Sequence, residues 1–329
     1  MISITIPAYN AETTIGNTLK TLLDQNYPKN KYEIIVVDDG SADKTVEIAS
    51  KFPVKVIRAK HAGPSNARNL GAKKAKGGIL LFVDSDCIPD RNWIKNMVEP
   101  FKNKEIVGVS GTYKTLNKNK FVARFTGYEI EQRHEQMKKK KYIDFIGSYS
   151  AGYRKNIFLK FGGFDTRFKI ASGEDPELSY RIAKAGFKMI FQPKAFVYHP
   201  HPDTIQKYLK QKYQRAIWRN LMYWEKHKEK IISDSYTHKL LFPQAFISGL
   251  TFLIFLSLFF LGYGLLFTFS LIFISFLIIA FIFNLDVISF FWKKEKKIAL
   301  LAPFIFLLRN IVGILGVLVG LAKFAFKKI

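Results

Sequence analysis

Two aspartates one residue apart, Asp84 and Asp86, directly follow an apolar run at residues 79–83. Paired carboxylates at the end of a buried strand suit a divalent cation, and hard oxygen ligands favour Mg²⁺ or Mn²⁺. In proteins these ions usually bind phosphates together with one or two carboxylates, rather than all-protein cages. The stretch therefore predicts a Mn²⁺ or Mg²⁺ cofactor that carries a phosphorylated ligand.

Alternating apolar strands and amphipathic helices are expected to position these aspartates. The strands are expected at residues 2–6, where Pro7 ends the strand, 32–37, 54–58 and 79–83. The intervening helices are expected at about 14–25, 43–49 and 66–75. This order predicts an α/β fold with a mostly parallel sheet and helices on its faces.

Polar residues follow other strands of the predicted sheet as well. Asn10 lies beyond the first strand, and Asp38 and Asp39 end the second. Ligands of such sheets bind outside the carboxyl ends of the strands, so we expect these side chains to converge with Asp84 and Asp86. Neither a GxGxxG nor a GxxxxGK[ST] pattern is present, which disfavours a dinucleotide site or a P-loop.

The second part of the chain is less regular and more basic. Strands are expected at 106–109, 188–192 and 196–199, and a helix at 204–227 carries aromatic residues on one side and Lys and Arg on the other. Such a helix either packs on the globular domain or lies in a lipid interface. Its position just before a long apolar segment favours the interface.

A membrane anchor is indicated by residues 240–285, which include no Lys, Arg, Asp or Glu. Since about 20 residues cross a bilayer as a helix, two crossings fit. A third apolar stretch, at 298–322, contains Arg309 and has lysines at both ends. It is either a third crossing or an interfacial or re-entrant helix, and the lysines slightly favour the second interpretation.

The net charge of +25 at pH 7 suggests nucleic acid, an anionic membrane surface or a phosphorylated substrate as partner. The Lys and Arg residues are dispersed and no nucleic-acid-reading motif occurs, so we expect no nucleic acid partner. The single cysteine, Cys87, excludes an intrachain disulfide and is expected to be a small buried residue. No signal peptide is expected before the first strand, and no feature indicates an oligomeric state.

Five segments together resemble the inverting family 2 glycosyltransferases of the GT-A fold. They are ITIPAYN, VVDDGSADKT, HAGPSNARNLG, LLFVDSDCIPD and GEDPELSYRIAKAG, and their order and spacing match over about 200 residues. The resemblance implies a GT-A (nucleotide-diphospho-sugar transferase) sheet and transfer of a sugar from a UDP- or GDP-sugar. It also implies a metal-dependent hexosyltransferase.

The resemblance implies a role for each matching residue. The nucleotide-sugar site would comprise Pro7, Ala8, Tyr9, Asn10, Asp38 or Asp39, Gly63, Arg68, Asp84 and Ser85. Asp86 would hold the metal, and His199 is equally well explained as a further metal ligand or as a structural histidine. Asp175 would be the catalytic base, and its distance in sequence from Asp86 suits a base that must lie away from the metal to keep a useful pKa. Glu174, Arg154 and Lys155 would lie on the acceptor side.

With this resemblance the chain divides into four predicted segments. They are a catalytic domain at 1–203, an interface helix region at 204–239, two transmembrane helices at 240–292 and a membrane-associated end at 293–329. The expected location is the cell membrane, multi-pass, with the catalytic domain on the cytoplasmic side. The basic domain and the apolar segments predict an anionic membrane and a lipid-linked acceptor, a polyprenyl phosphate or diphosphate carrying a glycan, as partners.

Three alternatives remain open. The first is a synthase of polyprenyl-phosphate sugars, and the second is a processive polysaccharide synthase. Against the second, Gln214, Arg215 and Trp218 depart from the QxxRW spacing of those enzymes. The third is a non-catalytic membrane scaffold with a transferase-like domain.

Overall fold

The computed structural model describes residues 1–170, 172–225, 247, 257 and 265–325. The chain divides into two compact units. Unit 1 comprises Met1–Asn117 and His134–His201, and unit 2 comprises Lys118–Arg133 and Pro202–Ile329. Of the predicted pair of crossings at 240–292, residues 240–246, 248–256 and 258–264 lie outside the described residues.

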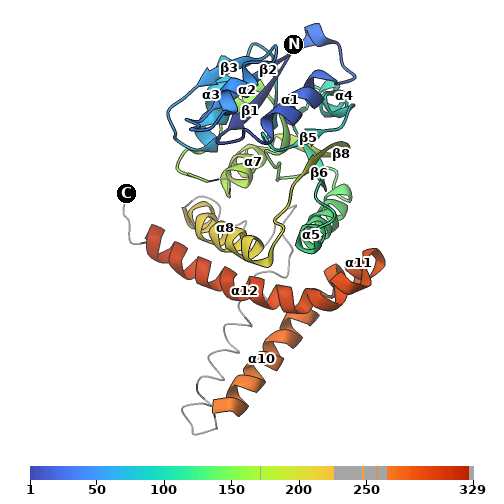
Figure 1. Cartoon of the computed structure of the whole chain (residues 1–329), viewed down its shortest axis with the longest axis vertical. Helices are drawn as coiled ribbons and strands as arrows, with labels where there is room; N and C mark the ends of the chain where they lie inside the picture. Colours follow the sequence, from blue (N-terminus) through green and yellow to red (C-terminus); the bar gives the residue numbers. More distant parts are fainter. Residues whose placement is uncertain (171, 226–246, 248–256, 258–264, 326–329) are drawn as a thin grey trace. The chain divides into compact units, whose positions relative to one another are not determined.

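Unit 1 is built on an eight-stranded mixed sheet with the order β3-β2-β1-β4-β7-β6-β8-β5 (Figure 1). Its first four strands are parallel and confirm the predicted α/β arrangement. They are β1 (Ile2–Ala8), β2 (Tyr32–Asp38), β3 (Lys55–Arg58) and β4 (Ile79–Val83). All residues of β1 are buried, and β4 is apolar on both faces, which suits a sheet covered on two sides.

Three predicted helices connect these strands. They are α1 (Ile15–Leu23), α2 (Thr45–Ala49) and α3 (Pro64–Lys74). Ile15, Leu19 and Leu22 of α1 recur at helical spacing and are fully buried, because they form the face that packs on the sheet.

The expectation that Pro7 ends the first strand was wrong, since β1 continues to Ala8. Pro7 pairs with Val37 of β2, while the pairing of β1 with β4 stops at Thr5. A proline offers no N–H to a sheet, and here the end of β1 has a strand neighbour on one side only. The missing donor therefore interrupts no ladder with β4.

The rest of the sheet departs from the parallel pattern. Strand β7 (Ser150–Arg154) runs antiparallel between β4 and β6 (Ile106–Thr115), and β8 (Lys188–His199) runs parallel to β6. The two short strands expected at 188–192 and 196–199 are thus one strand, which β5 (Ile88–Pro89) joins at its end. The remaining helices and 3-10 turns of unit 1 are η1 (Lys29–Lys31), α4 (Trp93–Val98), η2 (Glu99–Lys102), α6 (Lys155–Lys160) and α7 (Glu174–Lys184).

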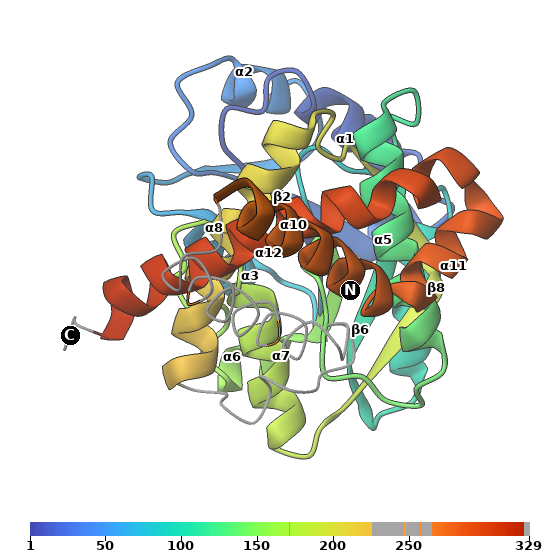
Figure 2. The same cartoon turned by 90° about the horizontal axis from the view of Figure 1, so that it is seen from below.

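Unit 2 is helical. Among its described residues, the helices are the first part of α5 (Phe121–Lys138), then α8 (Ile205–Glu225), α10 (Leu265–Ile282), α11 (Leu285–Lys294) and α12 (Lys296–Ala325). The predicted helix at 204–227 is confirmed as α8, which runs beside α12 (Figure 2). Within the described residues, the segment Lys296–Phe324 is long and apolar enough to cross a membrane, and Ser270–Ile282 with Leu285–Lys294 forms a second such segment bent by 71°.

Candidate active site

The polar residues expected at the strand ends do lie at one edge of the sheet. Ala8 is level with Asp38, and Asp38 with Arg58, across the parallel strands β1, β2 and β3. Strand β4 pairs with β1 in the same direction and leads directly into Asp84. The carboxyl ends of these four strands therefore lie at one edge of the sheet, as the parallel arrangement predicted.

Asn10 joins the first two loops of this edge. Its backbone N–H donates to Ser41 Oγ at 2.9 Å, and its side-chain Oδ1 accepts from the backbone N–H of Ala42 at 2.9 Å. Asn10 adopts a φ of +48°, which asparagine tolerates better than most residues. This turn leaves the ring of Tyr9 half exposed and stacked on His61, with 4.3 Å between ring centroids.

The neighbouring Asp38 and Asp39 have different surroundings. Asp39 Oδ1 and Oδ2 accept from the backbone N–H groups of Ala62 and Gly63, each at 2.9 Å. Gly63 has a φ of +97°, and a Cβ there would meet the Lys169 carbonyl oxygen at 3.0 Å, so this loop requires glycine. Asp39 thus fixes the loop that leads into α3.

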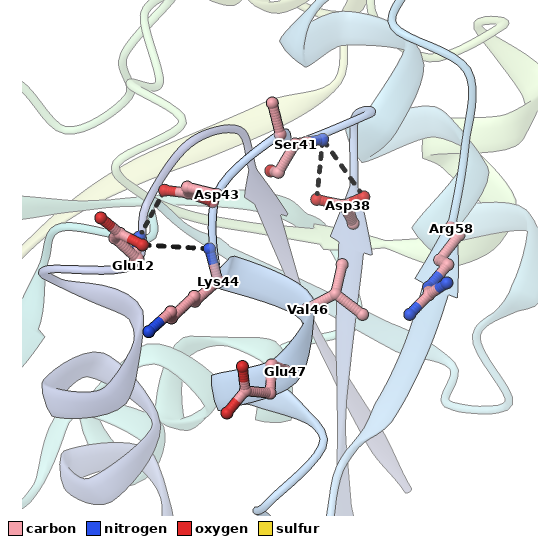
Figure 3. Close-up of a pocket in the computed structure, with 9 residues that line it drawn as sticks. Glu12, Asp38, Ser41, Asp43, Lys44, Val46, Glu47 and Arg58 are labelled. Carbon is pink, nitrogen blue, oxygen red and sulfur yellow. Dashed lines mark hydrogen bonds between the residues drawn. The ribbon is translucent and has the colours of Figure 1, made fainter.

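Asp38 instead borders a cavity of about 600 Å³ at the ends of β2 and β3 (Figure 3). Its carboxylate accepts long hydrogen bonds, 3.3 and 3.4 Å, from the backbone N–H of Ser41. Arg58 and Lys44 also line the cavity, together with Glu12 and Glu47. Of the two aspartates, Asp38 therefore has the carboxylate that borders open space.

Arg68 lies beneath the Asp84 carboxylate, almost completely buried. One guanidinium nitrogen donates to Asp84 Oδ1 at 2.7 Å, and the other to Glu174 Oε1 at 3.1 Å. Burial by itself lowers the pKa of Arg68, but the Asp84 and Glu174 carboxylates outweigh it and raise the pKa above its ordinary value. A single cation thus links the end of β4 to the start of α7.

Asp175 follows Glu174 in the first turn of α7 and faces the same edge. The backbone N–H of Ser148, just before β7, donates to Asp175 Oδ2 at 3.0 Å. Oδ1 is buried and has no hydrogen-bond partner among the described residues. Burial, followed by repulsion from Glu174, raises the pKa of Asp175 to about 7 against the attraction of Arg68. A carboxylate with a free oxygen and such a pKa is suited to accept a proton near neutrality.

A candidate metal group is formed by residues just after Asp84 together with the end of β8. Carboxylate and imidazole atoms of Asp86 and His199, with the Cys87 sulfur, lie within 4.8 Å of one another, and Asp86 Oδ1 is 3.6 Å from His199 Nε2. Burial raises the pKa of Asp86 and, more strongly, that of Cys87, so the thiol keeps its proton. The oxygen and nitrogen donors of Asp86 and His199 fit Mn²⁺ or Mg²⁺, whereas a protonated thiol does not.

Other predicted residues are less directly placed. Pro7 and Ala8 are buried within β1, and Ser85 offers its carbonyl oxygen to Thr18 Oγ1 at 2.9 Å. The expected acceptor-side position of Arg154 and Lys155 does not match their placement. Because β7 runs antiparallel to β4, Arg154 is level with Ile79, at the opposite edge from Asp84.

Two contributors were not predicted from the sequence. Ser148 supplies the N–H to Asp175, and Asn69 binds both the N–H and the carbonyl of Phe164, which ties α3 to the loop before α7. Asn69 directly follows Arg68 in the matching segment HAGPSNARNLG, so its position in that segment could have pointed to it. Nothing in the sequence pointed to Ser148, because a backbone N–H is present at nearly every position.

Comparisons with known proteins identify the family of the first part of the chain. Residues 3–162 match the family described as glycosyl transferase family 2. Residues 3–162 therefore form a family 2 glycosyltransferase domain. The chain is 29% identical over 246 residues to the "Probable glycosyltransferase YdaM" of Bacillus subtilis. That alignment covers 70% of this chain and only 56% of the relative.

Two further comparisons extend the likeness. A Methanococcus voltae protein named "Dolichyl N-acetyl-alpha-D-glucosaminyl phosphate 3-beta-D-2,3-diacetamido-2,3-dideoxy-beta-D-glucuronosyltransferase" is 24% identical over 247 residues, which is 67% of this chain and 73% of the relative. The solved structure "Mannosyltransferase PcManGT from Pyrobaculum calidifontis in complex with GDP-Man and Mn2+" has a TM-score of 0.62 at 18% identity, covering 96% of this chain and 86% of that one. The family 2 domain therefore has the GT-A fold that its motifs implied.

Proposed function

We propose that the protein is a membrane-bound, inverting glycosyltransferase that moves a sugar from a nucleotide-diphosphate sugar to a lipid-linked acceptor. The observation that carries the proposal is the position of Asp175. Its free carboxylate oxygen lies at the strand-end edge, and Arg68 connects the neighbouring Glu174 to Asp84. One site would thus contain both a base and a set of donor-binding carboxylates.

The donor would bind across the carboxyl ends of β1, β2 and β4. Tyr9 offers an exposed ring for stacking, and Asp38 offers a carboxylate that faces the cavity. Asp86 and His199 would hold Mn²⁺ or Mg²⁺, which neutralises the charge of a leaving diphosphate. The Pyrobaculum mannosyltransferase was solved in complex with GDP-Man and Mn²⁺, and this pair of ligands is consistent with the same chemistry here.

Asp175 would act on the acceptor. Its Oδ1 takes the proton of the acceptor hydroxyl as that oxygen attacks the anomeric carbon, and the diphosphate leaves from the opposite side. The Ser148 N–H bond to Oδ2 fixes the orientation of the carboxylate. This direct displacement inverts the anomeric configuration.

A lipid-linked acceptor is supported by two features. The dolichyl phosphate in the name of the Methanococcus relative belongs to this substrate class, and unit 2 contains segments long and apolar enough to enter a bilayer. A cytoplasmic site for unit 1 follows because nucleotide sugars are supplied there. The same arrangement would also serve the synthesis of polyprenyl-phosphate sugars, so the product of the transfer assay must be identified.

The first experiment measures donor binding by the full-length protein. Thermal shifts with UDP- and GDP-sugars, with and without Mn²⁺, should show metal-dependent stabilisation by one nucleotide class. Asp86→Ala should weaken the apparent affinity for the nucleotide sugar at least tenfold, because it removes a proposed metal ligand. Asp90→Asn, a change in the following loop outside the metal group, is the matched control. Absence of any nucleotide effect on folded protein would overturn the proposal and favour a scaffold.

A further inference from the structure

Helix α12 (Lys296–Ala325) has an apolar face that the described residues leave uncovered. Its exposed residues recur three or four positions apart along nearly the whole helix, which places them in one stripe. The stripe consists of Leu300, Phe304, Leu308, Ile311, Leu315 and Leu318, and the exposed residues Leu301, Val317 and Val319 lie next to it in the sequence. A continuous apolar face of this length requires either a partner protein or lipid.

The opposite face of α12 is packed against polar helix α8. Gly316 and Gly320 are buried there, and a Cβ at either position would meet the Tyr213 or Ile217 carbonyl oxygen at 2.7 Å. Asn220 of α8 also donates to the Val317 carbonyl oxygen at 3.2 Å. The two backbones are therefore in close contact, and α8 carries five Lys and Arg residues along its length.

Charged groups reach the middle of α12 as well. Arg309, the fourteenth of its 30 residues, donates to Glu129 Oε1 of α5 at 3.0 Å. The same carboxylate accepts from Lys212 of α8 at 2.8 Å and from Arg133 of α5 at 3.0 Å. At its start, α12 is preceded by Glu295, which binds Arg124 of α5 through two bonds of 2.9 and 3.0 Å.

These contacts conflict with a crossing by α12. The centre of a spanning helix lies at the bilayer midplane, and Arg309 would take Glu129, Lys212 and Arg133 there with it. Ionised groups at that depth are costly and rare, and neither α5 nor α8 is an apolar helix. A helix lying along the surface has no such conflict, because its inner face remains on the side of the polar helices.

We propose that α12 lies in the plane of the cytoplasmic membrane interface, with its exposed leucine stripe in the acyl region and its Arg309 face toward α5 and α8. The flanking charges fit an anionic lipid surface. Lys293, Lys296 and Lys297 are exposed before the first turn or in it, and Lys323 is exposed near the last turn. Both groups of lysines then lie on one side of the bilayer, as the positive-inside rule favours.

The inference deepens the proposed function, since it rests on membrane attachment but not on sugar transfer. The test therefore uses topology and depth in place of activity. Single cysteines are introduced into the full-length protein at Lys297 and Ala322, at the two ends of α12, and at the exposed Lys51 of unit 1 as a reference for the cytoplasmic side. The native Cys87 is fully buried, and unsubstituted protein measures its background.

A membrane-impermeant maleimide is applied to sealed inverted vesicles before and after detergent. We expect Lys297→Cys and Ala322→Cys to react like Lys51→Cys, without detergent. Reaction of only one end of α12 in sealed vesicles would show a crossing and overturn the proposal.

Depth is measured with a fluorophore at Leu301→Cys, Leu308→Cys or Leu315→Cys in phosphatidylethanolamine–phosphatidylglycerol vesicles that contain lipid spin labels. An in-plane helix predicts that a shallow label quenches all three positions to a similar extent. Leu159→Cys, which is comparably exposed in unit 1, should not be quenched. Selective quenching of Leu308→Cys by a deep label, or no quenching at any of the three, would contradict the proposal.

Discussion

The two units each bury one charged group among several of opposite charge, but with reversed signs. In unit 1 the Arg68 guanidinium lies between the Asp84 and Glu174 carboxylates. In unit 2 the Glu129 carboxylate receives Arg133, Lys212 and Arg309. The first arrangement leaves excess negative charge beside a group suited to a metal ion, whereas the second has more cations than its central carboxylate neutralises.

The cluster of unit 1 is therefore suited to bind a ligand, whereas the cluster of unit 2 connects helices of the fold. Asp84 is partly exposed, and Asp175 keeps an unbonded oxygen, so unit 1 has groups available to a ligand. Both oxygens of Glu129 are occupied by donors from three helices, α5, α8 and α12. Burial alone raises the pKa of Glu129, and the three cations together lower it below the ordinary value, so the carboxylate stays charged.

The largest expected effect comes from Asp175→Asn. Loss of the proposed base should lower the rate of transfer about 10²- to 10⁴-fold. Donor binding should persist, because Asp86, His199 and Arg68 remain. The measurements are initial rates of transfer and donor affinity on the same preparation. Transfer at the normal rate would show that another residue takes the proton.

In unit 2 the corresponding change is Glu129→Gln. Removal of the charge leaves three cations without their common partner, and breaking a buried ion pair typically costs about 3–5 kcal/mol. Thermal unfolding and limited proteolysis within α8 should both report the loss. Glu131→Gln is the matched control on the same helix, because Glu131 forms an exposed pair with Lys294 that contributes about 1 kcal/mol or less. Equal losses of stability in the two variants would show that the buried Glu129 cluster contributes no more than an exposed ion pair.

In unit 1, Arg68→Met removes the central cation of the cluster and so tests the same comparison. It should cost about 3 kcal/mol, at the lower end of the range for a buried pair, because Asp84 has access to water. It should also shift the pH profile of transfer upward, since Arg68 lowers the pKa of Asp175. Arg68→Lys retains the charge but not the two-pronged geometry, and should restore the pH profile better than the stability. An unchanged profile in Arg68→Met would mean that Arg68 has only a structural role.

The sequence was most informative where structure is local. The strands β1 to β4 and helices α1 to α3 follow from apolar periodicity, and the Asp84-Asp86 pair follows from its position after β4. Pairings over long separations were not readable, such as Arg68 with Glu174, 106 residues apart, or Glu129 with Arg309, 180 residues apart. The expected position of Arg154 failed for a related reason, because the direction of β7 depends on its neighbours in the sheet and not on its own residues.

The smallest effect expected is the pH dependence of transfer by the unsubstituted protein. A base must be deprotonated, so with a pKa of about 7 for Asp175 the rate should rise about tenfold per unit below pH 7 and level off above it. Stability should change in the opposite sense. The folded state holds this proton more tightly than the unfolded state, so the contribution of Asp175 is present below its ordinary value of 3.8 and is lost as pH rises toward 7.

Asp175→Asn separates these two dependences. The variant should lose the rise in rate and also the loss of stability between pH 4 and 7 that the carboxyl group causes, so it should be more stable than the unsubstituted protein at pH 8. The measurement is the thermal unfolding of both proteins across this pH range. If the variant and the unsubstituted protein lose stability in parallel, the buried charge lies elsewhere and Asp175 is an ordinary helix-start carboxylate. If they diverge, the charge that destabilises unit 1 is the charge required for its chemistry, whereas the buried charge of unit 2 stabilises its fold.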